Sequence, residues 1–118
     1  MRAFTHLHVA SAFSAHHGTS APEALVTAAA EQGARMAAIV DRDCLSGAVR
    51  HIRASLEHGV EPIVGVDLAL LPSRRAEPDP LPAGGPRVAV LARGRAQGDG
   101  WAALCRLVSS AQDRKSVV

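Results

Sequence analysis

Short runs of apolar residues alternate along the chain with segments in which apolar residues recur every three or four positions. The continuous apolar run at 36–40 is typical of a strand that is buried on both faces of a parallel sheet. Other runs rich in apolar residues predict three more strands, at 3–9, 62–70 and 87–92. The recurring apolar positions predict helices at about 20–33 and 45–59, and a last helix from about Gln97 or Asp99 to Ser110.

Proline and glycine mark the ends of these predicted elements. The sequence Ser-Ala-Pro-Glu at 20–23 fits a capping box, with Pro22 in the first helical turn, where its missing N–H is tolerated. Gly33 and Gly59 stand where a helix C-terminus favours a residue with positive φ. The segment 72–86 holds five prolines and two glycines, which predicts an irregular connection.

The alternation of strands and helices predicts an α/β fold with a parallel sheet and right-handed crossovers. Ligand sites in such folds collect at the carboxyl ends of the strands. His8, Asp41 and Asp67 each stand at or near the end of a predicted strand. The pattern therefore predicts that imidazole and carboxylate groups gather at one rim of the sheet, a donor set that suits zinc, manganese or iron.

His6 and His8 are separated by one residue in the first predicted strand. Residues i and i+2 of a strand point to the same face, so the two imidazoles are expected to converge on one spot, as a metal site requires. The alternative is a pair of exposed or hydrogen-bonded histidines without a ligand role.

Length and composition fit one small domain, because the chain has 118 residues, of which 47% are hydrophobic. The net charge is +2 and the thirteen basic residues are scattered, so the sequence carries no electrostatic footprint for direct DNA binding. Cys44 and Cys105 are too far apart for a zinc motif and indicate reduced thiols. No apolar run reaches membrane-spanning length and no leader is recognisable, so we expect a cytoplasmic protein.

Several segments resemble one known family, the PHP (polymerase and histidinol phosphatase) domain. The matching segments include FTHLHVAS at 4–11 and GVEPIVGVD at 59–67, with shorter matches at 13–14, 40–41 and 47–49. The segments 90–92 and 101–109 further resemble the N-terminal PHP domain of the bacterial DNA polymerase III alpha subunit, including the error-prone type. The resemblance covers almost the whole chain, about residues 2–112.

This resemblance implies a distorted (β/α)7 barrel, of which the chain would hold a partial PHP-type barrel with parallel strands, truncated after about four strands. We expect a single partial domain over 1–118, with the proline-rich loop at 72–86 and a frayed tail at 113–118. The family's later motifs lie beyond Val118. This leaves open a fragment of a longer protein, a truncated gene product or a remnant.

The resemblance also implies a set of metal ligands. His6 and His8 match the family's first ligand pair, and Asp41 matches the aspartate of its Thr-Asp-His signature. Asp67 stands where the family has a glutamate, and His17 replaces the aspartate of an Asp-Gly turn. The implied cofactor is a divalent metal, namely zinc, manganese or iron.

Departures from the family pattern affect this metal site. Arg42 replaces the histidine that follows Asp41 in the family, and a guanidinium is not a metal ligand. Ala10 replaces a frequent histidine, and Asp67 is one methylene shorter than glutamate. We expect Arg42 to pair with Asp41 or Asp67 in place of the metal's charge, and the alternative is that Arg42 binds a phosphate. Whether a metal is retained stays open.

The implied function is that of the N-terminal part of a PHP domain in a DNA polymerase III alpha-like protein of replication or translesion synthesis. The departures favour a portion that is non-catalytic alone and supports the polymerase, and no residue is assigned a catalytic role. The alternative is a metal-dependent phosphoesterase or 3′–5′ exonuclease. Expected partners are the remaining polymerase domains or a second copy bound through open sheet edges, with DNA contacted only indirectly and no membrane.

Overall fold

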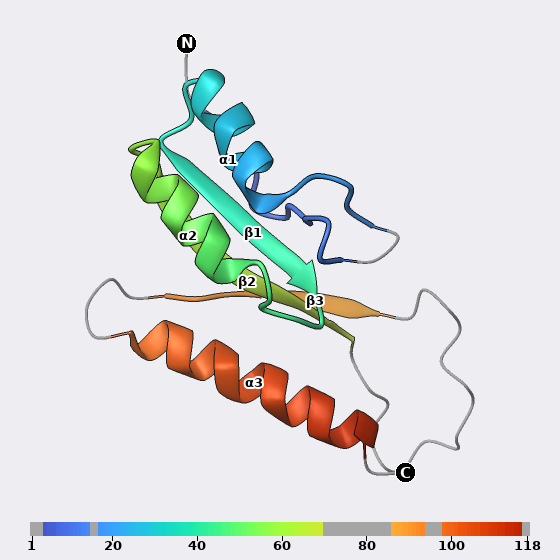
Figure 1. The fold of residues 1–118 in the computed structure, drawn as a ribbon. Helices are drawn as coiled ribbons and strands as arrows, with labels where there is room; N and C mark the ends of the chain where they lie inside the picture. The colour runs from blue at the N-terminus through green and yellow to red at the C-terminus, as the bar shows by residue number, and fades with distance from the viewer. Residues whose placement is uncertain (1–3, 15–16, 70–85, 94–97, 117–118) are drawn as a thin grey trace.

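The structure, a computed structural model, describes residues 4–14, 17–69, 86–93 and 98–116. Within them the chain forms three helices and three strands. The helices are α1 (Pro22–Glu31), α2 (Ala48–Glu57) and α3 (Asp99–Ser116). The strands are β1 (Met36–Arg42), β2 (Glu61–Ala69) and β3 (Arg87–Leu91). The predicted α/β class is confirmed as a small α/β domain (Figure 1).

The three strands form one mixed sheet in the order β1-β2-β3. β1 pairs with β2 in parallel, in a register that places Arg42 beside Asp67. β3 runs antiparallel to β2, and its first residue, Arg87, pairs with Ala69. The carboxyl ends of β1 and β2 and the beginning of β3 therefore meet at the same rim of the sheet.

The prediction that all strands are parallel is wrong for β3. A parallel return to the sheet usually requires a crossover helix, whereas an antiparallel return requires only a loop. The proline-rich sequence between β2 and β3 has no helical periodicity, so the sequence predicts no crossover helix there. The loop predicted at 72–86 lies, except for Pro86, outside the described residues.

The strand predicted at 3–9 is also absent from the described part of this segment, 4–9. One backbone hydrogen bond, in which the Val40 N–H donates to the Val9 carbonyl at 2.7 Å, ties this segment to β1. β1 is the outer strand of the described sheet, so residues 4–9 could pair only with the free edge of β1. A single backbone hydrogen bond to that edge does not form a strand pair.

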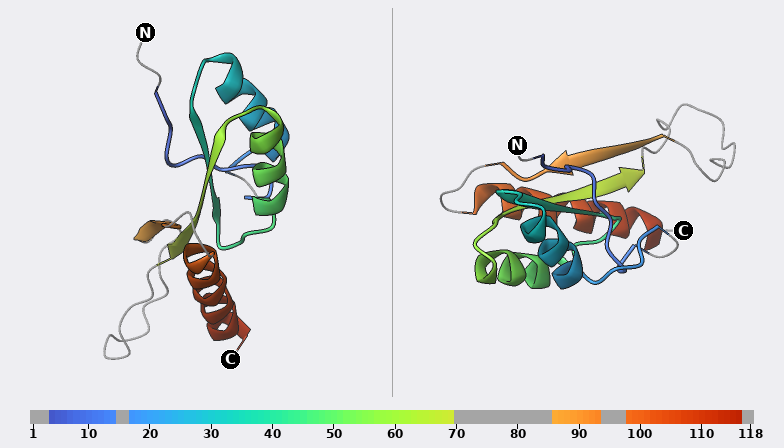
Figure 2. Two further views of the ribbon diagram at one scale, coloured as in Figure 1. Left: turned by 90° about the vertical axis from the view of Figure 1, so that its left-hand side faces the viewer. Right: turned by 90° about the horizontal axis from the view of Figure 1, so that it is seen from above.

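The helices pack on the sheet through two apolar clusters. In one, Ile39, Val64 and Val66 of the sheet meet Ala48 of α2 and Leu104 of α3. In the other, α1 and α2 contribute one residue each, and the full cluster is Val26, Ala37, Ala54 and Val60. Figure 2 shows α1 and α2 on one side of β1 and the N-terminal segment on the other side. The helices therefore hold the sheet in place from one face, and the sheet in turn positions the rim where β1 and β2 end.

The C-terminal ends of α1 and α2 agree with the predicted glycine positions, whereas the N-terminus of α1 differs from the prediction. Gly33 and Gly59 follow α1 and α2 with φ of 79° and 67°, as predicted. Pro22 opens α1, but the N-cap is Ala21 without a side-chain hydrogen bond, so the capping box predicted at 20–23 does not form. α3 extends to Ser116, beyond its predicted end, so the predicted tail is helical up to that residue.

None of the helices in the described ranges is both long enough and apolar enough to cross a membrane.

We predict that Leu104→Ala destabilises the fold by about 2–5 kcal/mol, because this side chain is 1% exposed and joins α3 to the sheet. The matched control is Leu107→Ala on the same helix, where the side chain is 43% exposed and the cost should stay below about 1 kcal/mol. Urea unfolding followed by circular dichroism measures both. Equal midpoints for the two variants would contradict the packing of α3.

Candidate functional site

The last two residues of β1, Asp41 and Arg42, point to opposite faces of the sheet because side chains alternate along a strand. In the parallel register Arg42 is the neighbour of Asp67, and their side chains share one face. Asp41 therefore lies on the other face, away from Asp67. Two of the predicted ligands are separated by the sheet itself.

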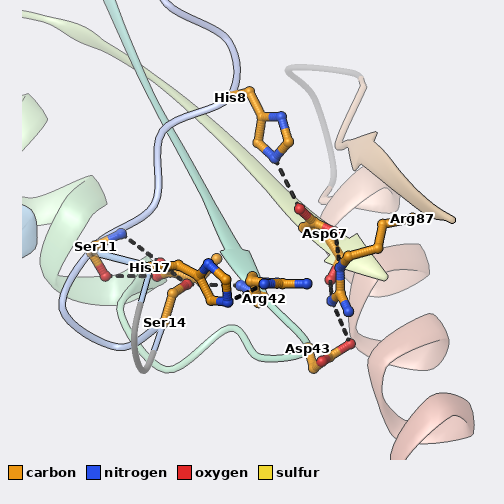
Figure 3. A network of polar contacts seen from close by, with 9 residues as sticks. His8, Ser11, Ser14, His17, Arg42, Asp43, Asp67 and Arg87 are labelled. Carbon is orange, nitrogen blue, oxygen red and sulfur yellow. Dashed lines mark hydrogen bonds and ion pairs between the residues drawn. The ribbon is translucent and has the colours of Figure 1, made fainter. Parts of the chain in front are cut away.

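Asp41 is 2% exposed and accepts three hydrogen bonds from the turn that follows the N-terminal segment. Its Oδ1 accepts from the Ser11 N–H at 2.6 Å and from the Ser14 hydroxyl at 2.7 Å, and its Oδ2 accepts from the Ser11 hydroxyl at 2.8 Å. The Ser14 hydroxyl in turn accepts from the Arg42 backbone N–H at 2.8 Å. Through these hydrogen bonds Asp41 holds the turn at the end of β1. Figure 3 shows Ser11 and Ser14 of this turn.

The turn also depends on a glycine. The Gly18 backbone N–H donates to the Ser14 carbonyl at 3.1 Å, and the Gly18 Cα lies so close to the Ser11 carbonyl that a Cβ there would clash with it. Only glycine allows the chain to return this closely to residue 11. The return brings His17 toward the rim of the sheet.

Asp67, at the carboxyl end of β2, is 6% exposed and holds a different set of partners. Its Oδ1 accepts from Arg87 Nε at 2.6 Å, and its Oδ2 accepts from His8 Nε2 at 2.9 Å. Arg87 Nη2 donates to the Asp67 carbonyl at 2.9 Å and forms an ion pair with Asp43 Oδ1 at 3.0 Å. Both carboxylate oxygens of Asp67 are therefore engaged.

Asp43, the residue that follows β1, completes this arrangement. Its backbone N–H donates to the Asp67 carbonyl at 2.9 Å, and its φ of 59° is in the left-handed region. An aspartate tolerates this conformation better than most residues. We call the three residues Asp43, Asp67 and Arg87 the rim clamp, because they join the ends of β1 and β2 to the start of β3 (Figure 3).

Electrostatics favour the ionised forms of the clamp. Burial, the largest single influence on Asp67, opposes its ionisation, but hydrogen bonds from Arg87 and His8 reverse the balance and lower the pKa of Asp67. Burial likewise opposes the charge of Arg87, yet hydrogen bonds to Asp67 and Asp43 raise the pKa of its guanidinium. The clamp is an ion pair at neutral pH.

A hollow of about 400 Å³ lies beside the clamp. Its polar lining consists of Asp67 and four nitrogen-bearing side chains, namely His8, His17, Arg42 and Arg87. Among the described residues Arg42 forms no ion pair with Asp41 or Asp67, so the predicted pairing is wrong. The Arg42 guanidinium contacts His17 Nε2 instead, and the guanidinium that neutralises Asp67 is that of Arg87.

His6 lies apart from this hollow. Its ring meets Phe4 edge-on with centroids 4.7 Å apart, and it borders a separate apolar cavity of about 180 Å³ between the N-terminal segment, α1 and β1. The two imidazoles of His6 and His8 do not share a cavity, because residues 4–9 do not form the strand that would align them. The structure brings together His8, His17, Arg42 and Asp67, and leaves His6 and Asp41 elsewhere.

These side chains do not fit the divalent metal that the resemblance implies. The hollow offers one carboxylate, whose oxygens are engaged, and two guanidinium groups that repel a cation. Within the described ranges no group of three or more His, Cys, Asp or Glu residues is arranged to hold a metal ion. The ligand roles of His6, His8, His17, Asp41 and Asp67 stay predictions.

Arg87 is the site residue that sequence reasoning missed. It was expected only as the first residue of a strand, and a parallel strand would have placed it at the opposite rim. An antiparallel return from β2 brings the beginning of β3 beside the end of β2, and Arg87 beside Asp67. The sequence between β2 and β3 lacks helical periodicity, and this signal could have indicated an antiparallel return and so located Arg87.

We predict that Asp41→Asn destabilises the fold by about 1–3 kcal/mol, because an amide nitrogen cannot accept the hydrogen bonds that the carboxylate accepts. The control is Asp99→Asn at the exposed start of α3, which should cost less than about 1 kcal/mol. Urea unfolding at pH 7 measures both free energies. Indistinguishable values would contradict a structural role for Asp41.

We predict that Arg87→Gln lowers the free energy of unfolding by about 1–3 kcal/mol at pH 7. Since the pKa of Asp67 is lowered in the folded state, its contribution is fully present above the unfolded pKa and is lost as pH falls through the folded pKa. The difference between wild type and variant should therefore shrink below about pH 4. Unfolding curves at pH 7 and pH 3 measure it, with Arg106→Gln, on an exposed face of α3, as control.

Comparison with curated proteins finds error-prone DNA polymerases. The chain is 42% identical over 109 residues to an error-prone DNA polymerase of Mycolicibacterium paratuberculosis, and 34% identical over 113 residues to one of Corynebacterium diphtheriae. These alignments cover 92% and 96% of this chain and 9% of each relative. The chain thus spans less than a tenth of the length of these two polymerases.

Two solved structures share the fold. A Bifidobacterium adolescentis protein described as a metal-dependent phosphoesterase matches 75% of this chain and 26% of its own, with a TM-score of 0.50 and 24% identity. A Chromobacterium violaceum amidohydrolase, solved with sulfate and no metal, matches 86% of this chain and 32% of its own, with a TM-score of 0.57 and 21% identity. The family described as PHP domain matches residues 6–116. The chain therefore belongs to the PHP domain family.

Proposed function

We propose that this chain is the N-terminal part of a PHP domain in a DNA polymerase III alpha-like protein, where it has a structural and not a catalytic role. Identity of 42% to an error-prone DNA polymerase, over 92% of this chain, supports the polymerase branch. A role in DNA replication or translesion synthesis would place the protein in the bacterial cytoplasm.

The observation that carries the non-catalytic role is the rim clamp. Asp67, which the family resemblance makes a ligand position, directs both carboxylate oxygens to protein donors, Arg87 and His8. Arg42 adds a second guanidinium to the same hollow. Guanidinium groups keep their charge at every physiological pH, so they can hold carboxylates together as a metal would, without an exchangeable ligand position.

The proposed partners are the remaining domains of the same polymerase. β1 and β3 are the outer strands of the described sheet, and such edges offer backbone groups for pairing with further strands. Self-association through the same edges is the alternative partner. DNA contact would then be indirect, through the polymerase that this portion supports.

A metal-dependent phosphoesterase or 3′–5′ exonuclease is the second candidate function. His8 and Asp67, hydrogen-bonded at the rim of the hollow, favour it, because imidazole and carboxylate are metal ligands. For these two residues to hold a cation, Asp67 would have to release Arg87. The scaffold role needs no such rearrangement.

We predict that the purified chain contains far less than one equivalent of zinc, manganese or iron, and that its melting temperature is unchanged by EDTA, because the clamp needs no metal. Elemental analysis by mass spectrometry and thermal unfolding with and without EDTA measure these properties.

Two variants sharpen this test. If the chain is a phosphoesterase, the wild-type protein should contain about one equivalent of metal. The double variant His6→Ala/His8→Ala should lose this metal, and the control His58→Ala, at the exposed end of α2, should retain it. That result would overturn the scaffold role. Trace metal that is equal in all three proteins would support it.

A further inference from the structure

We propose that the chain self-associates through an apolar stripe on α2, which packs antiparallel against the same stripe of a second copy about a two-fold axis. The stripe consists of Val49, Ile52 and Leu56, and we call it the α2 stripe. This contact uses a helix face and not a sheet edge. It is therefore independent of the structural role proposed above and of the strand edges considered there.

α2 faces its own domain with small and polar side chains. Its buried residues are Ala48, His51, Ala54 and Ser55. The Ser55 hydroxyl is completely buried and has no hydrogen-bond partner among the described residues. A helix that packs only on its own domain normally turns its large apolar side chains toward the core. α2 instead leaves its largest apolar side chains outside.

Three contacts fix α2 in this orientation. Ala54 packs against α1 in one apolar cluster, and Ala48 packs against the sheet in the other. The His51 Nε2–H group donates to the Ala37 carbonyl of β1 at 2.8 Å. A rotation of α2 that buried the α2 stripe would break these contacts, so the stripe stays at the surface.

The α2 stripe is continuous and accessible. Leu56 is 69% exposed and Val49 is 60% exposed, and among the described residues only Phe4 is a more exposed large apolar side chain. Ile52 lies between them and is partly buried at the edge of a core cluster. Spacings of three and four place the stripe on one flank of the helix. Figure 2 shows α2 beside α1 at the outside of the domain. A stripe of this kind indicates a contact surface, which a single exposed leucine does not.

The charges beside the α2 stripe favour a second copy as the occupant. Arg53 and Glu57 are both exposed, lie four residues apart and carry opposite charges. Neither forms an ion pair with another described residue. In an isologous contact, residue i meets residue j and j meets i. With the two-fold axis near Ser55, each Arg53 meets Glu57 of the other copy, and the two Leu56 side chains meet at the axis.

The α2 flank is thus complementary to itself, whereas a different protein would need a matching acid and base in the same order. The net charge of +2 gives little repulsion between two copies. One short helix from each copy buries less than the roughly 1,200 Å² of a standard interface, so the dimer is expected to be weak. It should form at about 100 µM chain or above.

Sedimentation equilibrium of the full chain, from about 10 µM to about 1 mM, tests the proposal. The wild-type chain should show a reversible monomer–dimer equilibrium. Leu56→Glu should raise the Kd of the dimer about tenfold or more, because it places two carboxylates together at the axis. Leu107→Glu, at a 43% exposed leucine of α3, is the matched control and should keep the wild-type Kd. Circular dichroism shows that each variant is folded, as expected for exposed positions.

A charge exchange tests the two-fold arrangement. Arg53→Glu and Glu57→Arg should each raise the Kd about three- to tenfold, because each change replaces two ion pairs with like charges. The double variant Arg53→Glu/Glu57→Arg restores both pairs and should return the Kd to within about twofold of the wild-type value.

Three results would overturn the proposal. One is a chain that stays monomeric over the whole concentration range. Another is a dimer that Leu56→Glu leaves intact, which would place the contact at a sheet edge or on another helix. The third is a double variant as weak as the single variants, which would exclude the reciprocal pairing of Arg53 with Glu57. None of these results bears on the metal content, so the proposed structural role is tested separately.

Discussion

The pairing of Arg87 with Asp67 is the interaction on which the rim of the sheet depends. Asp67 is almost fully buried, and a buried carboxylate is costly without a cation and several hydrogen bonds. Arg87 supplies both, and through Asp43 it reaches β1 as well. One guanidinium thus holds the ends of three strands, which are not adjacent in sequence, in one arrangement.

The same pairing explains why the site lies where a metal centre is expected in this fold class and yet has no free carboxylate to bind a metal. The carboxyl ends of parallel strands carry the functional residues, as the fold class predicts. At this rim, however, charge is balanced between side chains of the chain itself. Arg42 is then left with an imidazole partner, and its positive charge faces the hollow and not a carboxylate.

Much of the fold could be predicted from local pattern. The buried apolar run at β1, the helical periodicity of α2 and the two glycines after the helices all correspond to observed elements. Partners across the sheet could not be predicted in this way, because strand direction depends on what connects the strands. The position of Arg87 follows from that direction alone.

The candidate site was predictable in location and only partly in membership. Alternation along β1 could have separated Asp41 from Arg42, since neighbouring residues face opposite sides of a sheet. The separation of His6 from His8 could not be foreseen, because it depends on whether 4–9 pairs with β1. Whether a segment at the edge of a sheet forms a strand depends on its tertiary contacts and not on its own sequence alone.

The antiparallel return of β3 has a consequence for how this domain can vary. The chain leaves β2 and enters β3 at the same rim, next to the rim clamp. Residues can therefore be inserted or deleted between the two strands without changing the register of either one. In a lineage of such proteins, the connection between β2 and β3 is the place where segments of different length and composition can evolve while the sheet stays the same.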